Sequence, residues 1–179
     1  MSVSAVIPVR AGSTRVKNKN IRDFAGSSLL EIKIEQLKAV PYIDEIIVSS
    51  DSDEMLQLAV QKGVTAKKRP DEYCDEKTKT FNEVVRYISG NEVKTDIMIW
   101  APCVCPLVTS DLFAQGIEMF NRIQDGEIDG DSVVTASLIK EYLFDENGPI
   151  NFSVEHHVPS QKLPNWHFIT NGFFIAETI

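Results

Sequence analysis

A short loop near the N-terminus carries the residue types that a phosphate ligand needs. Arg10, Gly12 and Lys19 lie within the segment Val9–Asn20, which follows an apolar run at Val3–Pro8. Gly12 lets the backbone approach a ligand closely because it has no Cβ atom, and successive loop amides form an anion-binding concavity. Arginine and lysine neutralise phosphate charge. Together these features predict a polyphosphate site, although for any one residue alone a solvated basic side chain is the simpler interpretation.

The glycine pattern separates this loop from two well-known phosphate sites. The P-loop pattern GxxxxGK[ST] is absent, and so is the dinucleotide pattern GxGxxG. The chain has a formal net charge of −8, which argues against non-specific binding to nucleic acid or to an anionic membrane. A small anionic substrate remains compatible with that charge, because the loop gathers local cations at Arg10, Arg15, Lys17 and Lys19.

Composition predicts a single cytoplasmic domain over residues 1–179. A chain of 179 residues with 43% apolar residues is long enough to bury one hydrophobic core. The three cysteines, an odd number, give no disulfide framework, and Cys103-x-Cys105 lacks the further ligands of a zinc site. Reduced cysteines and an N-terminus unlike a signal peptide indicate the cytosol.

The elements that must position the loop alternate between strands and helices. Apolar, β-branched runs predict strands at Val3–Pro8, Glu45–Ser49, Val64–Lys67, Asp96–Ala101 and Ser132–Ala136, and a last strand at Phe168–Ala176 broken at Asn171-Gly172. Helical spacing and capping residues predict four helices. The first covers Ser27–Lys38 with Ser27 or Ser28 as N-cap, and the second runs from Asp51 or Ser52 to about Lys62. The third covers Thr78–Ile88 and is stopped by Gly90, and the fourth runs from Thr109 or Ser110 to about Ile123.

This order predicts an α/β fold with three layers: a mostly parallel twisted sheet with helices on both faces. Residues 140–165 are polar and predict a small excursion from it. In open α/β sheets, ligands bind beyond the carboxyl ends of the strands. That rule brings Val9–Asn20, Ser49–Asp53 and Pro102–Pro106 near one another.

The loop resembles the signature of cytidylyltransferases that activate acidic sugars, the acylneuraminate enzymes and the related enzyme for 3-deoxy-manno-octulosonate. Their pattern is roughly I-P-A-R-x-G-S-[KT]-R-x-x-x-K-N, and this chain matches it at Ile7, Pro8, Arg10, Gly12, Ser13, Thr14, Arg15, Lys19 and Asn20. Weaker matches follow in the family's order at residues 48–54, at Arg69-Pro70 with Thr78–Thr80, at Cys105-Pro106-Leu107 and at residues 170–175.

The resemblance implies a fold like that of nucleotide-diphospho-sugar transferases and a transfer of CMP from CTP to a small acidic sugar. Arg10 and Lys19 would be the catalytic cations. The nucleotide would be bound by Ala11, Gly12, Ser13, Asn20, Arg69 and Thr80, although Thr78 competes with Thr80 as the aligned residue and both suit helix starts. The sugar would be bound by Cys103, Lys140, Lys162, Asn171 and Phe173.

The sugar half departs from the family pattern. The polar residue that precedes the family's PTSP-like turn is replaced by Pro102, or by Cys103 if the turn is shifted. The family's basic residue before a Leu-Pro pair is Ser160 here, with Lys162 or Lys140 as candidate replacements, and its strand tyrosine is Ile175. The acceptor is therefore expected to be either an unusual sugar acid or a sugar that is not a sialic acid.

The resemblance also implies Mg²⁺ as the cofactor. The family binds it with an Asp-x-Asp downstream of the last matched strand. The sequence therefore either lacks the family's C-terminal tail, which places these ligands beyond Ile179, or has lost the ligands. Asp51 and Asp53 are alternative metal ligands, but acidic residues at a helix start are commonly partners of the helix dipole. His156-His157 is more simply an exposed loop pair without a third ligand.

Three hypotheses follow from the sequence. The first is a CTP-dependent sugar-acid cytidylyltransferase, expected to be a homodimer built through Lys140–Lys162. The second keeps the fold with another nucleotide or sugar. The third is a catalytically weak nucleotide-binding module, motivated by the altered sugar positions.

Overall fold

Two compact units make up the chain. The computed structural model describes residues 1–12, 16–75 and 77–179. The first unit contains residues 1–134 and 172–179, and the second contains residues 135–171, which include the predicted excursion. Among the described residues, no helix combines the length and apolar composition that a membrane crossing requires.

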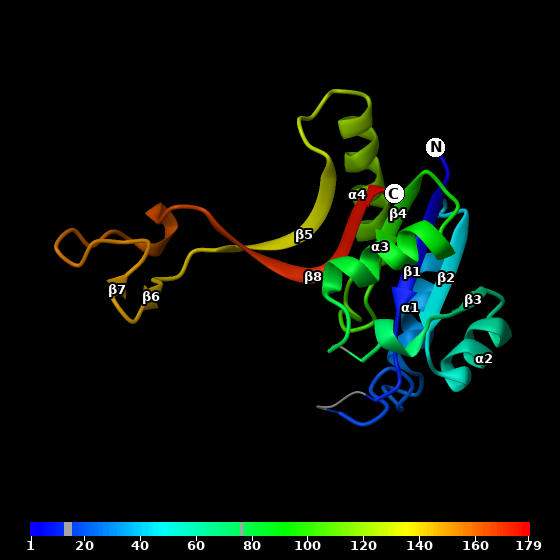
Figure 1. Cartoon of the computed structure of the whole chain (residues 1–179). Helices are drawn as coiled ribbons and strands as arrows, with labels where there is room; N and C mark the ends of the chain where they lie inside the picture. The colour runs from blue at the N-terminus through cyan, green and yellow to red at the C-terminus, as the bar shows by residue number, and fades with distance from the viewer. Residues whose placement is uncertain (13–15, 76) are drawn as a thin grey trace. The chain divides into compact units, whose positions relative to one another are not determined.

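The core of the first unit is a parallel sheet made of β1 (Val3–Pro8), β2 (Glu45–Ser50), β3 (Thr65–Lys68) and β4 (Ile97–Trp100). The full strand order is β3-β2-β1-β4-β8-β5, where β5 is Ser132–Ile139, and β8 (Trp166–Glu177) runs antiparallel to β4 (Figure 1). Pro8 pairs with Ser49, and Val6 pairs with Trp100, so β1, β2 and β4 end at one edge of the sheet. The predicted mostly parallel sheet is confirmed.

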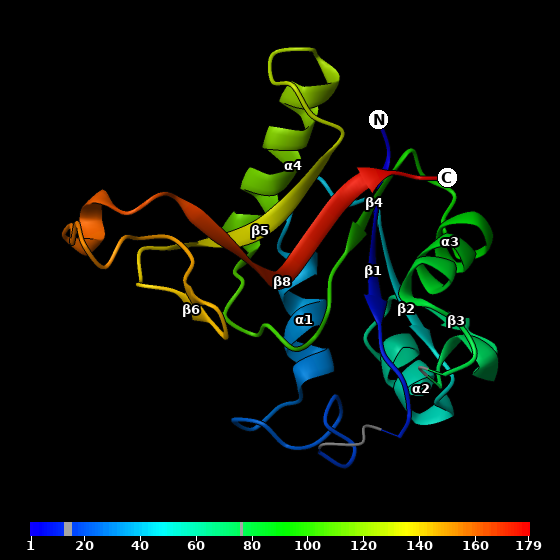
Figure 2. The same cartoon turned by 60° about the vertical axis from the view of Figure 1, so that its left-hand side comes forward.

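Helices cover both faces of this sheet, as predicted. Three of them, α1 (Leu29–Lys38), α2 (Asp53–Gln61) and α4 (Ser110–Gln124), share one apolar cluster with the strand residues Val3, Ala5 and Ile7. The fourth, α3 (Phe81–Glu92), packs in a second cluster with Val6, Ile47 and Met98. Because adjacent strand residues face opposite sides, the two clusters lie on opposite faces. Figure 2 shows α3 on one side and α1 with α4 on the other.

Capping side chains fix where the helices begin. Ser28 caps α1 and Ser52 caps α2, each by accepting a hydrogen bond from a backbone N–H of the first turn. Thr80 caps α3 through a reciprocal capping box with Glu83, so this helix begins at Phe81 rather than at Thr78. Thr109 is the N-cap of α4, without a side-chain hydrogen bond.

Two predicted breaks are wrong. Helix α3 continues through Gly90 to Glu92, because a glycine costs only about 1 kcal/mol in a helix interior and the buried Ile88 and Glu92 pack on either side of it. Strand β8 continues through Asn171-Gly172. Asn171 has a φ of 55°, a left-handed conformation that asparagine adopts readily, so the strand accommodates this residue without ending.

The second unit holds little regular structure. Strand β5 (Ser132–Ile139) extends past the predicted Ala136, and β6 (Phe144–Asp145) pairs with β7 (Gly148–Pro149). Short 3-10 turns occur here at Ser160–Lys162 and, in the first unit, at Asp71–Tyr73. The second unit is organised around Tyr142, whose ring contacts the rings of Phe152 and His157.

Candidate active site

A cavity of about 570 Å³ lies at the edge of the sheet where the parallel strands end. Its described lining comes from three segments: residues 8–10, 16, 19 and 20 at and after the end of β1, residues 69, 73, 74, 79–81 and 84 after β3, and residues 100 and 102–104 at the end of β4. A volume of this size suits a ligand as large as a nucleotide. The predicted convergence of the segments after β1 and β4 is therefore confirmed, and the segment after β3 joins them. Ser49–Asp53, predicted at the same edge, does not line the cavity but lies next to the β1 segment, where Val9 N donates to the Ser49 carbonyl oxygen at 3.0 Å.

Positive charge gathers in this cavity. Four cationic side chains line it, Arg10, Lys19, Arg69 and Lys79, and the described lining residues include no aspartate or glutamate. The whole chain, in contrast, has a formal net charge of −8. A concave site with one sign of charge attracts a ligand of the opposite sign, so the cavity is suited to a polyanion.

Arg69 fastens two of the lining segments together. Its side chain is 3% exposed, and its Nη2 donates to the carbonyl oxygen of Val9 at 2.7 Å, while its Nε donates to Cys74 Sγ at 3.0 Å. Arg10 Nη1 donates to the Cys74 carbonyl oxygen at 3.1 Å. Burial raises the pKa of the Cys74 thiol, which therefore stays neutral at physiological pH. These bonds hold both guanidinium groups at the cavity wall.

Lys19 and Asn20 join the cavity from the end of the loop. Asn20 is buried, and its carbonyl oxygen accepts a hydrogen bond from Leu30 N at 2.9 Å, which fixes the loop to the start of α1. Lys19 is half-buried, and within the described part of the chain its ammonium group has no hydrogen-bond or ion-pair partner. Its charge is thus available to a ligand.

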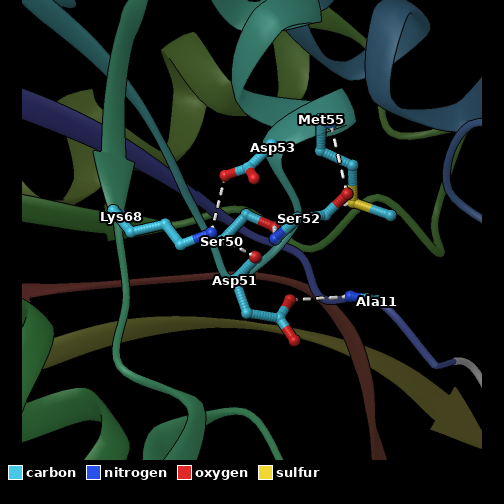
Figure 3. A network of polar contacts seen from close by, with 7 residues as sticks. All are labelled: Ala11, Ser50, Asp51, Ser52, Asp53, Met55 and Lys68. Atoms are coloured by element: carbon cyan, nitrogen blue, oxygen red, sulfur yellow. Dashed lines mark hydrogen bonds and ion pairs between the residues drawn. The ribbon is translucent and has the colours of Figure 1, made fainter.

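The predicted cradle of loop amides is partly engaged within the protein. The N–H of Ala11 donates to Asp51 Oδ1 at 2.7 Å (Figure 3). Gly12 has a φ of 70°, the left-handed conformation for which glycine is suited. Ala11 and Gly12 lie beside the lining residues rather than among them. Ser13, the third predicted amide, lies outside the described residues, as do Thr14 and Arg15.

The arrangement of Asp51 and Asp53 does not fit a metal site. Lys68 Nζ lies 2.6 Å from Asp53 Oδ1 and donates to the Asp51 carbonyl oxygen at 2.7 Å (Figure 3). No group of three or more metal-ligating side chains occurs among the described residues. Asp53 is the first residue of α2, where a carboxylate is stabilised by the helix dipole.

Thr80 lines the cavity and also caps a helix. Its hydroxyl donates to Glu83 Oε2 at 2.8 Å and accepts from Glu83 N at 3.3 Å. Thr78, the competing candidate, donates instead to Asp75, lowering the pKa of that carboxyl to about 2, and does not line the cavity. Of the two threonines, Thr80 is the one at the site.

The wall after β4 is mostly apolar. It consists of Trp100, Pro102, Cys103 and Val104, and the Phe81 ring meets Trp100 edge-on at 5.5 Å between centroids. Burial raises the pKa of Cys103 to about 12, so this thiol is neutral and is not a nucleophile. The predicted sugar residue Cys103 does lie at the cavity, but it offers little polarity there.

The other predicted sugar residues are not brought to this wall within the first unit. Phe173 is buried in the core, where it packs 4.9 Å from the Phe113 ring and so close to Gly116 that a Cβ there would approach it to 2.6 Å. Lys140, Lys162 and Asn171 belong to the second unit. Lys140 Nζ donates to the Leu163 carbonyl oxygen within that unit.

Several lining residues were not predicted from the sequence. Lys79, which also lies 5.4 Å from the centre of the Tyr73 ring, stands between the two threonines that the motif singles out, so its position was a usable signal. The others carry no motif: Val16, Tyr73, Cys74, Phe81, Val84, Trp100 and Val104. These residues line the cavity because the segments that follow β1, β3 and β4 meet at the same edge of the sheet.

Comparison with known proteins identifies the family of the chain. A family model described as cytidylyltransferase matches residues 4–158, most of the chain. The chain belongs to the cytidylyltransferase family.

Members of this family with assigned activities are similar to the chain over different lengths. A pseudaminic acid cytidylyltransferase from Campylobacter jejuni serotype O:2 is 27% identical over 162 residues, which covers 88% of this chain and 69% of that protein. A CMP-N,N'-diacetyllegionaminic acid synthase from Legionella pneumophila is 42% identical over 65 residues, covering 36% of this chain and 28% of that protein.

The fold is also shared with a solved structure of CMP:2-keto-3-deoxy-manno-octonic acid synthetase in complex with CTP. The TM-score is 0.71 at 16% identity, covering 99% of this chain and 75% of that one. This likeness confirms the predicted nucleotidyltransferase fold.

Proposed function

We propose that this cytidylyltransferase transfers CMP from CTP to a nonulosonic acid, a nine-carbon acidic sugar, with release of pyrophosphate. The anomeric hydroxyl oxygen of the sugar attacks the α-phosphorus of CTP, the bond to the pyrophosphate oxygen breaks, and the hydroxyl proton passes to solvent. The named activities of the Campylobacter and Legionella relatives support this substrate class.

The observation that carries the proposal is the charge of the cavity. Four cationic side chains and no described carboxylate line a cavity in a chain with a net charge of −8. Phosphoryl transfer needs little covalent chemistry from a protein and depends on positioning and on neutralising the charge that builds up on the phosphates. The cavity can position the substrates between its walls, and its four cationic side chains can neutralise the phosphate charge.

The predicted residues at and beside the cavity have distinct roles in the proposal. Arg10 and Lys19 neutralise the triphosphate, while Asn20, Arg69 and Thr80 hold the nucleoside. The N–H of Ala11 contributes once a phosphate oxygen takes the place of Asp51 Oδ1, which now accepts it at 2.7 Å. Gly12 allows the close approach of the backbone. The acceptor sugar lies against Pro102, Cys103 and Val104.

We propose further that Mg²⁺ enters the reaction bound to the triphosphate. The described residues bring no three ligating side chains together, so no protein ligand is assigned to the ion. The homodimer through Lys140–Lys162 and the cytoplasmic location also remain proposals. The odd number of cysteines, which gives no disulfide framework in the sequence, is the observation behind the proposed location.

A pyrophosphate-release assay tests the function. The protein is incubated with CTP, Mg²⁺ and one sugar at a time: pseudaminic acid, N,N'-diacetyllegionaminic acid, N-acetylneuraminic acid and 3-deoxy-manno-octulosonic acid. We expect release with a nonulosonic acid and none when the sugar or Mg²⁺ is omitted. Tight CTP binding without release for any sugar would favour a nucleotide-binding module instead.

A further inference from the structure

A lysine is fully buried in the core beneath the cavity. Lys33 has no solvent-exposed surface and lies on the inner face of α1 together with Leu30, Ile34 and Leu37. Burial lowers the pKa of its ammonium group. Placing a cation among apolar side chains costs free energy that a methionine of similar shape would not cost, so the packing of α1 alone does not account for this residue.

The Lys33 ammonium group is directed at the turn that follows β4. Its Nζ donates to the carbonyl oxygen of Cys105 at 3.1 Å, and it lies 5.0 Å from the centre of the Phe113 ring. One helical turn further along α1, Gln36 Nε2 donates to the Pro106 carbonyl oxygen at 2.6 Å. Figure 2 shows the segment between β4 and α4 passing α1. Two α1 side chains therefore hold this turn by hydrogen bonds to its carbonyl oxygens.

The front of the same turn is the apolar wall of the cavity, made by Pro102, Cys103 and Val104. In the strand order, β4 lies on one side of β1 and β3 lies on the other. The arginine-anchored segment after β3 and the loop after β1 take the nucleotide in the proposed function. The β4 side is then where a second substrate approaches the α-phosphorus.

We propose that Lys33 is a positioning residue for the acceptor: by holding the Cys105 carbonyl oxygen, it sets the Pro102–Val104 wall at the distance from the phosphate loop that the sugar requires. This inference rests on the proposed function, because it assigns the β4 side to the acceptor. Lys33 touches neither substrate and acts through the turn.

Lys33→Met tests this role, because its effects on stability and on activity should separate. A purely structural lysine, once replaced, would lower stability and change all kinetic constants together. Methionine removes the cost of a buried charge but also the donor to the Cys105 carbonyl oxygen, so the two effects should offset each other and the melting temperature should change little. We expect KM for the acceptor to rise about tenfold, the loss of one hydrogen bond to a charged donor, with KM for CTP within about twofold of wild type.

Lys38→Met is the matched control. Lys38 lies on the same helix, is exposed, and donates to the Lys62 carbonyl oxygen away from the cavity. It should leave both KM values unchanged. Hydrogen exchange of the backbone in residues 101–109 provides a measurement that does not depend on activity, and it should be about tenfold faster in Lys33→Met with no change in β2.

The outcomes distinguish the two proposals. If wild type turns over and Lys33→Met keeps its acceptor KM, the inference fails while the function stands. If wild type turns over no sugar, the proposed function fails, and hydrogen exchange then tests the anchoring role of Lys33 by itself. Unchanged exchange at residues 101–109 then rejects the anchoring role, and faster exchange confined to that segment supports it.

Discussion

The two walls of the cavity are built in different ways. The nucleotide wall, made by the segments after β1 and β3, carries charged side chains that hold its own backbone: Arg69 donates to the Val9 carbonyl oxygen and Arg10 donates to the Cys74 carbonyl oxygen. The acceptor wall, residues 100–104, is apolar at its surface and is held from behind by Lys33 through Cys105. In the first wall the functional groups are also the scaffold, whereas in the second they are separate.

Each wall also has a buried ionisable group near it. Glu92 is 5% exposed and feels the charges of Arg69 and Lys67 on the nucleotide side. Lys33 is fully buried on the acceptor side. Substitutions in the nucleotide wall should therefore change phosphate chemistry directly, while those in the acceptor wall should change the fit of the sugar.

Removing a cation from the nucleotide wall should have the largest effect. Arg10→Ala deletes a charge assigned to the triphosphate, and loss of one such group typically lowers kcat about 100-fold or more. The acceptor KM should hardly change. Steady-state pyrophosphate release measures both constants. Lys17→Ala, an exposed cation of the same loop that does not line the cavity, should stay within about twofold of wild type, and equal losses in the two variants would contradict the assignment.

Charging the acceptor wall should have the next largest effect. Val104 is 48% exposed, so the fold should tolerate a charged residue there. Val104→Asp should raise KM for an acidic sugar about tenfold through repulsion at short range, and Val104→Lys should lower it. KM for CTP serves as the internal comparison. Changes of the same sign in both variants would show that the charge at this position does not face the sugar.

Glu92→Gln should change stability with pH. Burial raises the pKa of Glu92, so the folded protein binds this proton more tightly than the unfolded chain does. The wild-type glutamate therefore contributes full stability below the ordinary value of 4.5 and loses it as pH rises through the higher folded pKa. At pH 8 the glutamine variant should be more stable by about 1 kcal/mol, and the difference should vanish near pH 4. Urea unfolding at both pH values measures it, and a difference independent of pH would contradict the burial argument.

Asp51→Asn should have the smallest effect. The amide oxygen can still accept the Ala11 N–H, but the negative charge beside the phosphate loop is gone, which is worth about 0.5 kcal/mol in a well-solvated site. CTP affinity should rise about twofold by titration calorimetry. A large loss of affinity would instead mean that the Asp51 charge is needed to order the loop.

Much of the nucleotide wall was predictable because several of its polar and charged residues lie close together in the sequence. Arg10, Lys19 and Asn20 share one loop after a buried strand, and the edge rule for parallel sheets gives their location. Arg69 and Thr80 came from the family pattern rather than from physical reasoning. The engagement of the Ala11 N–H by Asp51 was not predictable, because it depends on two loops meeting in space.

The acceptor wall was much less predictable. Its residues are apolar and belong to a turn, so nothing in their types distinguishes a cavity wall from a core. Lys33 was missed because the helix from Ser27 was interpreted from its apolar residues alone. The spacing Leu30, Lys33, Ile34, Leu37 is the signal that places a lysine on the buried face. Phe173, predicted to bind the sugar, lies in the core because β8 packs on α4 at Gly116.

The most direct test of the cation-lined cavity as the CTP site is thermal unfolding of wild type and Arg10→Ala with CTP, UTP, GTP or ATP. A nucleotide present at 100 times its Kd adds about 2.7 kcal/mol of stability. We predict the largest shift for wild type with CTP and a much smaller one for Arg10→Ala. A larger shift with another nucleotide, or an equal CTP shift in the two proteins, would contradict the account.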